Sequence, residues 1–406
     1  MSSEDICREV SIVGGTYQEA CYWPAKNELY GSGWRAVRVF RALCPDATIS
    51  FHTAGDGEVE KLLKIYSRSE NLIVTIAALS KRVGFYYNHP LANPVIYNEV
   101  TEPLNLNVDG KKVIEFGMLE ATARVEGEWV VYDPQSPNNP FSFKQLGGKA
   151  THLALVLNEH EAKHLSGKDD LFAIRDVLFE NEGCECLVVK RGAKGAIVFA
   201  SNDDEGTRIP VFKTSYVWPI GSGDVFTTVF SYYWFSGRLP VDAAMKASKA
   251  VAAYCDCAGE IDIISNLIET GKYEEFVPKK RGMVYLAGPF FTLNEKLFVS
   301  ECRRLLLAMG VGVFSPYHDV GEGEAGDVAP KDIEKLKDCS CVFAIVDGLD
   351  SGTLFEIGYA VAMGIKVVAY VENESDGALK MLAGTGCTIE KDFTTAIYKT
   401  CWYAAE

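Results

Sequence analysis

The sequence CVFAIV, residues 341–346, runs directly into DGLDSGTLFEIGYA, residues 347–360. The six apolar residues predict a buried strand, the Asp/Gly/Ser-rich segment predicts a turn, and Leu354 to Met363 predicts a helix. In an α/β pattern, such a turn lies at the carboxyl edge of a parallel sheet, where ligands bind. We therefore expect Asp350, from the loop, and Glu356, from the first helical turn, to reach one crevice.

Two carboxylates in one crevice can divide their roles. One ionised carboxylate can attack an electrophilic carbon while the other binds substrate or transfers a proton. An anomeric carbon suits a carboxylate nucleophile, because its transition state carries oxocarbenium charge. The spacing Thr353-x-x-Glu356 also fits a capping box, in which Glu356 only bonds a backbone amide. The spacing leaves both interpretations open.

Several motifs in this region resemble the nucleoside 2-deoxyribosyltransferase family over about residues 282–406. The motifs are Tyr285-Leu286-Ala287-Gly288-Pro289-Phe290, Asp338, and Asp350-Ser351-Gly352-Thr353-x-x-Glu356-x-Gly358-Tyr359-Ala360. The resemblance implies that Glu356 is the nucleophile that takes the deoxyribosyl group. It implies that Asp350 and Asp338 hold the sugar or serve the base in proton transfer. It also implies substrate contacts from Tyr285, Gly288, Pro289, Phe290, Ser351 and Gly352.

Relatives in this family transfer the sugar to a second base or to water, and the motifs do not choose between these outcomes. Relatives also build each site across subunits with a neighbour's chain end, so the resemblance implies a homo-oligomer. The aromatic tail from Tyr398 to Tyr403 is a candidate for that role, with terminal packing as the alternative.

The composition favours two domains of an ordinary globular protein. The chain has 406 residues, of which 48% are hydrophobic and 23% charged. A net charge of -15 argues against a nucleic-acid partner, because phosphate binding needs clustered Lys and Arg. No apolar run reaches the length of a membrane helix, and the first residues do not resemble a secretory signal. We therefore expect a cytoplasmic protein.

The twelve cysteines are expected to be reduced thiols, because they are spread over a long chain without a secretory signal. Three pairs have Cys-x-Cys spacing, and in a strand residues two apart share a face, so a metal site is conceivable. That spacing lacks the usual Cys-x-x-Cys pattern and its histidine partners, so we do not expect a metal site there. The pairs are Cys184/Cys186, Cys255/Cys257 and Cys339/Cys341.

The first two-thirds of the chain repeats strand and helix patterns, which predicts a doubly wound α/β domain over residues 1–277. Residues 278–282 combine a proline, three cations and a glycine, and we interpret them as a linker. Met283 then begins a fresh strand and glycine turn. The second domain is therefore expected at 283–406, as a smaller flavodoxin- or Rossmann-like parallel sheet. We expect lid strands between Tyr86 and Glu126.

A glycine turn, Gly221-Ser222-Gly223-Asp224, directly precedes an apolar helix. Free backbone amides and the positive end of the helix attract phosphate, and Asp224 could take a proton from a hydroxyl that attacks a γ-phosphate. Upstream, Asn158-x-x-Glu161 follows a buried strand and could organise a magnesium–water shell. A tight turn and a helix cap are the alternatives for the two motifs.

Together these motifs resemble the ribokinase-like (PfkB) carbohydrate kinase family over residues 8–270. The resemblance implies an anion hole at Gly221, Ser222 and Gly223, with Asp224 as the catalytic base. It implies ATP and Mg²⁺, with Asn158 and Glu161 on the metal side and Lys190 and Gly192 on the nucleotide side.

The first half departs from that family. Ala36 stands where the family has a sugar-binding asparagine, and Thr16, Tyr17 and Glu19 occupy the stretch where a substrate-binding aspartate is expected. Because an unpaired buried hydroxyl partner is costly, such changes alter specificity. A nucleoside or a modified sugar is one acceptor that would fit an altered site. Nucleotide binding without turnover is the alternative.

The combined hypothesis is a fusion that cleaves or exchanges an N-glycosidic bond through Glu356 and phosphorylates a sugar or nucleoside hydroxyl with ATP and magnesium. The main alternative is a glycosidase gated by a nucleotide-sensing, non-catalytic kinase-like domain. A scaffold with two degenerate sites is less favoured, because the candidate catalytic residues of both sites are retained together.

Overall fold

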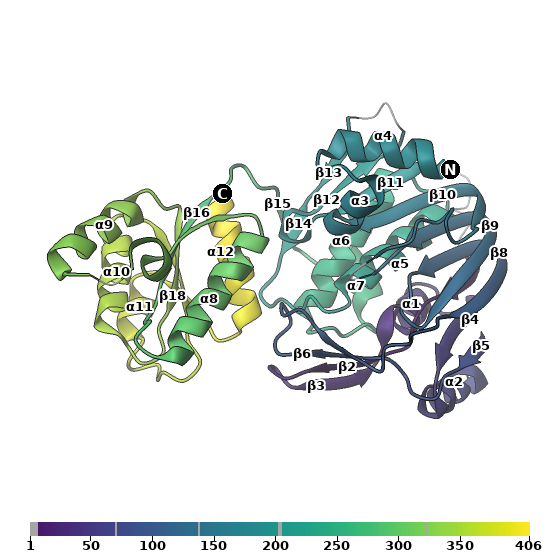
Figure 1. Ribbon diagram of the computed structural model, residues 1–406, viewed down its shortest axis with the longest axis horizontal. Coiled ribbons are helices and arrows are strands. Elements are labelled where there is room, and N and C mark those ends of the chain that lie inside the picture. The colour runs from purple at the N-terminus through teal and green to yellow at the C-terminus, as the bar shows by residue number, and fades with distance from the viewer. Residues whose placement is uncertain (1–6, 70, 137–138, 202–204, 322) are drawn as a thin grey trace. The chain divides into compact units, whose positions relative to one another are not determined.

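The computed structural model describes residues 7–69, 71–136, 139–201, 205–321 and 323–406. The chain forms two compact units (Figure 1). The first unit ends at Glu275 and excludes Ser215–Val217, which group with the second unit, Phe276–Glu406. The two units are described separately below.

The first unit is built on a nine-stranded sheet. All neighbouring strands are parallel except β12, which is antiparallel to both of its neighbours. In spatial order the strands are β13 (Thr207–Ile209), β12 (Ala196–Phe199), β11 (Cys186–Lys190), β10 (Lys149–Asn158), β9 (Ala121–Asp133), β8 (Leu104–Phe116), β1 (Glu9–Val13), β4 (Thr48–Gly55) and β5 (Leu72–Ala78). The antiparallel strands lie together at one end of the sheet.

Helices cover both faces of this sheet. One group packs together on one face: α1 (Gly31–Leu43), α5 (Ser222–Phe235), α6 (Pro240–Asp256) and α7 (Ile264–Thr270). On this same face α2 (Gly57–Ser69) lies against β5 and beside α1, where the ring of Tyr66 is 4.9 Å from that of Trp34. On the other face α3 (Glu159–Ser166) packs against α4 (Leu171–Glu182). The unit therefore has the doubly wound architecture that the sequence predicts.

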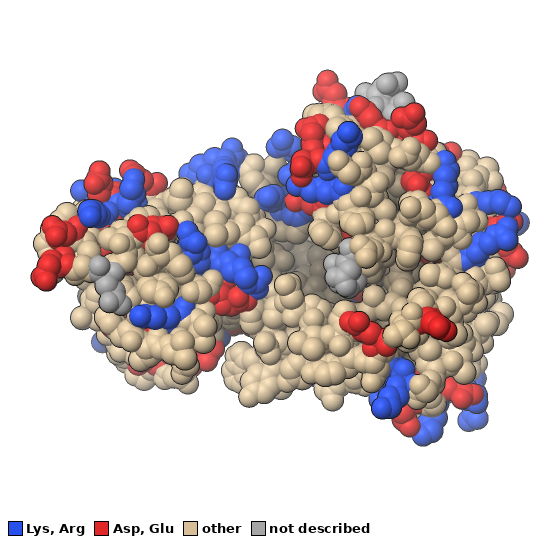
Figure 2. Space-filling model, in the orientation of Figure 1, with Lys and Arg blue, Asp and Glu red and all other residues tan. Residues whose placement is uncertain are grey.

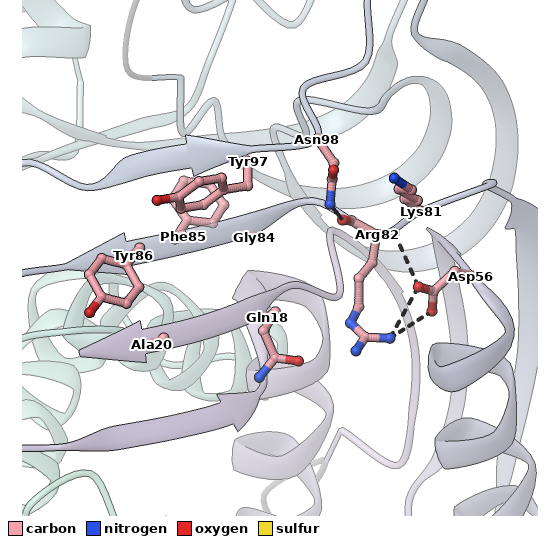
Figure 3. Close-up of a pocket in the computed structure, with 10 residues that line it drawn as sticks. All are labelled: Gln18, Ala20, Asp56, Lys81, Arg82, Gly84, Phe85, Tyr86, Tyr97 and Asn98. Atoms are coloured by element: carbon pink, nitrogen blue, oxygen red, sulfur yellow. Dashed lines mark hydrogen bonds and ion pairs between the residues drawn. The ribbon is translucent and has the colours of Figure 1, made fainter. Parts of the chain in front are cut away.

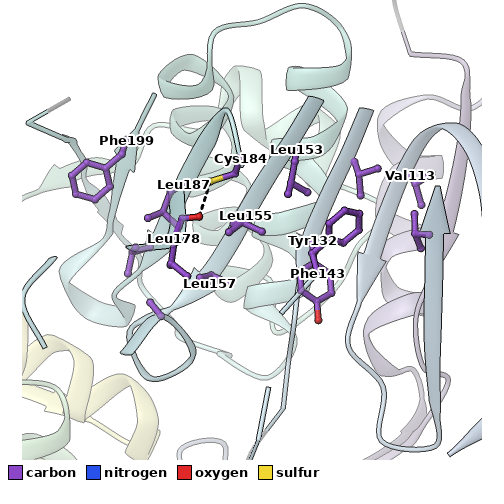
Figure 4. Close-up of a cluster of buried hydrophobic side chains, with 14 of the residues drawn as sticks. Val113, Tyr132, Phe143, Leu153, Leu155, Leu157, Leu178, Cys184, Leu187 and Phe199 are labelled. Carbon is purple, nitrogen blue, oxygen red and sulfur yellow. Dashed lines mark hydrogen bonds between the residues drawn. The ribbon is translucent and has the colours of Figure 1, made fainter. Parts of the chain in front are cut away.

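The core between the sheet and helices α3 and α4 shows why the strands are apolar on both faces (Figure 4). Leu155 and Leu157 on β10 join Tyr132 and Leu178 in one buried cluster. The intervening Val156 points to the opposite face and is also fully buried. A sheet with helices on both sides has no solvated face, so its strands are continuous apolar runs rather than alternating ones.

A second, smaller sheet stands apart from the central one. Its order is β3 (Lys26–Leu29), β2 (Gln18–Cys21), β6 (Gly84–Tyr87) and β7 (Val95–Tyr97). Strands β6 and β7 are thus present where lid strands were predicted, but β8 and the first part of β9, which also fall in that stretch, belong to the central sheet. The other half of the lid comes from 18–29, which the sequence analysis did not identify. A short pair, β14 (Val211–Lys213) with β15 (Glu274–Phe276), completes the strands of this part of the chain.

The second unit contains five parallel strands in the order β17 (Gly312–Phe314), β16 (Met283–Ala287), β18 (Cys341–Ile345), β19 (Lys366–Tyr370) and β20 (Thr388–Glu390). Numbered within the unit this order is 2-1-3-4-5, the flavodoxin-like arrangement, which confirms the predicted fold. Helices α8 (Leu293–Ala308) and α12 (Phe393–Ala405) cover one face, while α9 (Ala325–Lys337) and α10 (Ser351–Ala362) cover the other. A short α11 (Lys380–Gly384) precedes β20.

Acidic and basic side chains are interspersed on the face of the molecule shown in Figure 2. Among the described residues, none of the helices combines the length and hydropathy that crossing a bilayer requires.

Candidate active sites

In the second unit, the turn between β18 and α10 places the acidic residues at the carboxyl edge of the sheet. Gly348 and Leu349 both have left-handed backbone conformations, with φ of +85° and +51°. For leucine this conformation costs about 1–3 kcal/mol, and such strain is concentrated at functional sites. The turn brings Asp350 to the N-cap of α10, where its Oδ2 accepts bonds from the amide (2.8 Å) and hydroxyl (2.9 Å) of Thr353.

Glu356 does not form the alternative capping box. Asp350, not Thr353, caps the helix, and Oε1 of Glu356 instead accepts a 2.5 Å hydrogen bond from the hydroxyl of Tyr285. Tyr285 lies on β16, which neighbours β18 in the sheet. The Tyr285 hydroxyl therefore fixes the Glu356 carboxylate through Oε1, and this bond does not use Oε2.

The surroundings of Glu356 raise its pKa to about 7. Burial is the main cause, and the negative charges of Asp332 and Asp350 add to it, while the Tyr285 hydrogen bond acts in the opposite direction. Burial also raises the pKa of the Asp332 carboxyl, whose buried Oδ1 has no hydrogen-bond partner. The site thus brings together three carboxylates, one of which is partly protonated near neutral pH.

Two aspartates of the α9 segment lie in different surroundings. Asp338, expected beside the cassette, lies at the carboxyl end of α9, where its exposed side chain is 3.6 Å from Lys335. The aspartate that acts on Glu356 is Asp332, six residues earlier. Asp332 precedes the buried Leu336 by one helical turn and so shares its inward face, which Asp338 does not. That helical spacing is the signal that the sequence analysis missed.

The other residues expected at the substrate lie around this edge. Gly288, Pro289 and Phe290 follow β16, and the ring of Phe290 stacks with those of Phe291 (5.6 Å) and Tyr317 (5.4 Å). Ser351 and Gly352 are exposed in the first turn of α10. The aromatic group is a flat apolar surface of the kind on which a nucleobase stacks.

In the first unit, the glycine turn and Asp224 line a pocket of about 450 Å³. Gly221 has φ of +79° and precedes α5, and Ser222, Gly223 and Asp224 form the first turn of that helix. This geometry leaves backbone amides at the positive end of the helix dipole, which suits an anion. Lys190, Gly192, Asn158 and Glu161 line the same pocket, so the structure brings them together with Gly221, Gly223 and Asp224, while Ser222 lies in the same turn but does not line the pocket.

Both oxygens of Asp224 are engaged. Oδ2 accepts a 2.6 Å bond from the guanidinium of Arg35, and Oδ1 accepts one of 2.6 Å from the amide of Gln135. Neither partner was identified from the sequence. Both are distant along the chain, and an arginine in an amphipathic helix is normally expected on its solvated face.

Lys190 is held at the pocket by Asp133, at 2.5 Å from its Oδ2, and that same oxygen accepts a 2.6 Å bond from Thr227. Asp133 is fully buried, and burial raises its pKa despite the lysine. The other oxygen of Asp133, Oδ1, is buried without a partner. Gly192 begins a short 3₁₀ turn, Gly192–Lys194, that follows β11.

Asn158 and Glu161 form a complete capping box at the start of α3. The Asn158 side chain accepts from the Glu161 amide at 2.8 Å, and Glu161 accepts from the Asn158 amide at 2.8 Å. These two bonds confirm that Asn158 and Glu161 cap the helix. It does not use both oxygens of Glu161, whose pKa is raised to about 7 by burial and by the charge of Asp133.

The described residues contain no cluster of three or more His, Cys, Asp or Glu side chains that could hold a metal ion. All twelve cysteines are free thiols. The Glu161 carboxylate and the unpartnered oxygen of Asp133 nevertheless suit a hydrated Mg²⁺, which binds proteins through few carboxylates and keeps several waters.

The altered residues of the first half reach the same pocket. Tyr17 and Glu19 both line it. The Tyr17 hydroxyl donates a 2.8 Å bond to Glu120, and Glu19 binds Arg35. Thr16 is buried and pairs with Thr53 at 3.0 Å.

Two family models match this chain. Residues 119–266 match the model described as pfkB family carbohydrate kinase, and residues 284–393 match that described as nucleoside 2-deoxyribosyltransferase. The comparison with curated proteins finds no match.

Solved structures similar to this chain include a fructokinase and two ribokinases. A fructokinase double mutant from Vibrio cholerae O395, with fructose, ADP and potassium bound, is 13% identical with a TM-score of 0.51 and covers 66% of this chain and 99% of its own. Ribokinase from Giardia lamblia is 12% identical with a TM-score of 0.49, covering 65% and 99%. Ribokinase from Thermotoga maritima is 16% identical with a TM-score of 0.45, covering 64% and 99%.

The fold and these matches define a two-domain α/β protein in which each domain belongs to a family of enzymes. The chain contains a pfkB family carbohydrate kinase domain of ribokinase-like fold, followed by a nucleoside 2-deoxyribosyltransferase domain.

Proposed function

We propose that the carboxyl-terminal domain cleaves or exchanges the N-glycosidic bond of a nucleoside or nucleotide through a glycosyl-Glu356 intermediate. The observation that carries this proposal is the 2.5 Å bond between Tyr285 and Glu356, which orients a carboxylate at the carboxyl edge of the sheet. In the first step, an oxygen of ionised Glu356 bonds to the sugar's anomeric carbon. The carbon–nitrogen bond breaks, and its electron pair leaves with the base.

The departing base needs a proton, and Asp332 is the candidate donor. Its pKa is raised by burial, so it retains a proton more readily than an exposed aspartate, and its Oδ1 is free of protein partners. In the second step, a second base or water attacks the anomeric carbon and releases Glu356. Asp350 supports the site by fixing the start of α10 and contributes to sugar binding.

The amino-terminal domain is proposed to phosphorylate a hydroxyl of a sugar or nucleoside with ATP. The amides of the Gly221–Gly223 turn and Lys190 would bind phosphate, and Asp224 would accept the hydroxyl proton. Magnesium, when bound with the nucleotide, neutralises phosphate charge. Glu161, Asp133 and Asn158 would hold its water shell.

A second candidate for this domain is nucleotide sensing without phosphoryl transfer. The observation that favours it is the engagement of both Asp224 oxygens, by Arg35 and by Gln135. ATP turnover with candidate nucleosides separates the two functions, because only a kinase loses turnover in the Asp224→Asn variant while its nucleotide binding persists.

The central experiment incubates the full chain with a panel of nucleosides and nucleotides, with and without a second base, and follows the products by mass spectrometry. Base release, base exchange and phosphorylation are read in one assay. We expect Glu356→Ala to abolish base release and exchange. Unchanged base release in a folded Glu356→Ala variant would remove the glycosidic function.

The organisation proposed with this function is a cytoplasmic homo-oligomer with functional domains at 1–277 and 283–406, joined by 278–282. Light scattering tests the oligomer: an active monomer at micromolar concentration contradicts it.

A further inference from the structure

Arg35 is the most deeply buried cation of the phosphoryl-transfer pocket. It lies on α1 with 3% of its surface exposed, and its guanidinium packs on the backbone of Gly221, where an added Cβ would be 2.2 Å from Cζ. Its NH1 group lies 2.6 Å from Oδ2 of Asp224. The guanidinium thus occupies the space between the anion-binding turn and the proposed base.

Glu19 holds Arg35 in that position independently of Asp224. The two residues form a bidentate pair, with 3.2 Å between NH1 and Oε1 and 2.5 Å between NH2 and Oε2. Glu19 is itself fixed, since Oε1 accepts a 2.9 Å bond from the amide of Gly31. A two-point pair of this kind restrains the guanidinium in both position and plane.

These two residues stand in the stretches where this chain departs from the kinase pattern. Ala36, next to Arg35, replaces the expected asparagine, and Glu19 lies in the segment that lacks the expected aspartate. The departures therefore do more than delete contacts to an acceptor. They introduce an ion pair that touches the proposed base.

We propose that Arg35 blocks Asp224 by occupying one of its carboxylate oxygens. Water then cannot use this base to hydrolyse bound ATP before an acceptor hydroxyl arrives. This inference rests on the proposed binding of ATP by this domain. With NH1 on Oδ2 and Gln135 on Oδ1, neither oxygen faces the pocket without a donor. An acceptor hydroxyl displaces NH1 from Oδ2, while the bidentate bond to Glu19 keeps Arg35 in place.

When Arg35 does not block Asp224, water can take the place of the acceptor hydroxyl and ATP is hydrolysed. A water oxygen bonds to the γ-phosphorus while Asp224 takes one of its protons. The bond from the γ-phosphorus to the β–γ bridging oxygen breaks, so that ADP and inorganic phosphate leave. Asp224 then returns the proton to solvent. Arg35 is thus a positioning residue, because it acts through Asp224.

The test measures phosphate release from Mg·ATP without any acceptor, together with ATP binding by titration calorimetry. We expect Arg35→Gln to raise phosphate release at least about tenfold, since a freed general base contributes 10²–10⁴-fold. The rise should vanish in Arg35→Gln/Asp224→Asn, and ATP binding should persist in all variants. A structural defect would not produce a gain that depends on Asp224.

Two further variants keep the test decisive. Arg35→Gln/Glu19→Gln removes one charge of each sign, so it avoids leaving a second buried carboxylate unpaired if the single variant does not fold. Arg38→Gln is the matched control, because Arg38 lies on the same helix but pairs with Asp262 at 3.0 Å, and it should leave phosphate release unchanged.

The proposed role of Arg35 is overturned if phosphate release does not rise in either Arg35 variant, or if the rise persists in Arg35→Gln/Asp224→Asn. In both cases, ATP binding by the wild type leaves the proposed function of the domain intact. Absence of ATP binding by the wild-type chain overturns both.

Discussion

The hydroxyl of Tyr285, on β16, donates a 2.5 Å hydrogen bond to Oε1 of Glu356, on α10. The bond stabilises the ionised carboxylate in surroundings that otherwise favour its protonated form. A nucleophile needs both conditions. Burial makes the carboxylate less solvated and so more reactive, and the hydrogen bond keeps a usable fraction of it ionised near neutral pH.

The first prediction is the pH dependence of base release. Because Glu356 attacks in its ionised form and its pKa is about 7, kcat/KM should rise with pH through that value. Below it the rate should fall about tenfold per pH unit, as for a single ionisation. Rates of base release from pH 5 to pH 9 measure this limb. A limb near the ordinary glutamate value would contradict the buried environment.

The second prediction concerns Asp332, whose negative charge acts on Glu356. In its ionised form Asp332 raises the pKa of Glu356, so Asp332→Asn should move the acidic limb to lower pH. If Asp332 is the proton donor, the maximal rate should also fall, by about 10²–10⁴-fold.

Asp338→Asn is the matched control for that variant, since Asp338 is exposed and lies on the same helix. Its pH profile and rate should match those of the wild type. A larger effect from Asp338→Asn than from Asp332→Asn would return the role to the residue inferred from sequence.

The third prediction is that Tyr285→Phe shifts the limb in the opposite direction. The lost hydrogen bond raises the pKa of Glu356, so a smaller fraction is ionised at pH 7 and base release there should fall about tenfold or more. Part of the loss should be recovered at pH 9. Tyr370→Phe removes a hydroxyl that bonds Glu372 in the same domain and should leave the profile unchanged. A uniform loss at every pH would mean that Tyr285 acts only in substrate binding.

The sequence predicted the strand, turn and helix around Glu356 because local patterns determine them: six apolar residues and a turn rich in Asp, Gly and Ser. Helix α10 begins at Ser351, three residues before the predicted start, because Asp350 serves as the cap. The partners of these residues are long-range. Tyr285 and Glu356 are 71 residues apart, and Arg35 and Asp224 are 189 apart. Spacing carries no signal for such pairs without the fold.

The small sheet of β3, β2, β6 and β7 also depends on long-range pairing that the sequence does not reveal. Strands β2 and β3 are short and largely polar, so no apolar period marks them, and they form because β2 pairs with β6 more than sixty residues later in the chain. By contrast, the buried strands of the central sheet were visible as apolar runs, since they have helices on both faces.

The last prediction is that Glu356, which is needed for catalysis, lowers the free energy of unfolding of its domain when it is ionised. Its pKa in the folded state, about 7, lies above the ordinary glutamate value of 4.5, so the folded protein binds this proton more tightly than the unfolded chain. The stability contributed by the protonated form is complete below pH 4.5 and is lost as pH rises through 7.

Glu356→Gln keeps a neutral acceptor for Tyr285 at all pH values. It should therefore raise the free energy of unfolding of this domain by about 1–2 kcal/mol at pH 8 and change it little at pH 4.5. Calorimetric unfolding at the two pH values measures the difference, with exposed Glu334→Gln as the control that should change neither transition. A lower unfolding temperature for Glu356→Gln at pH 8 would mean that the ionised carboxylate is a net stabilising group, and the proposed buried nucleophile would lose its electrostatic basis.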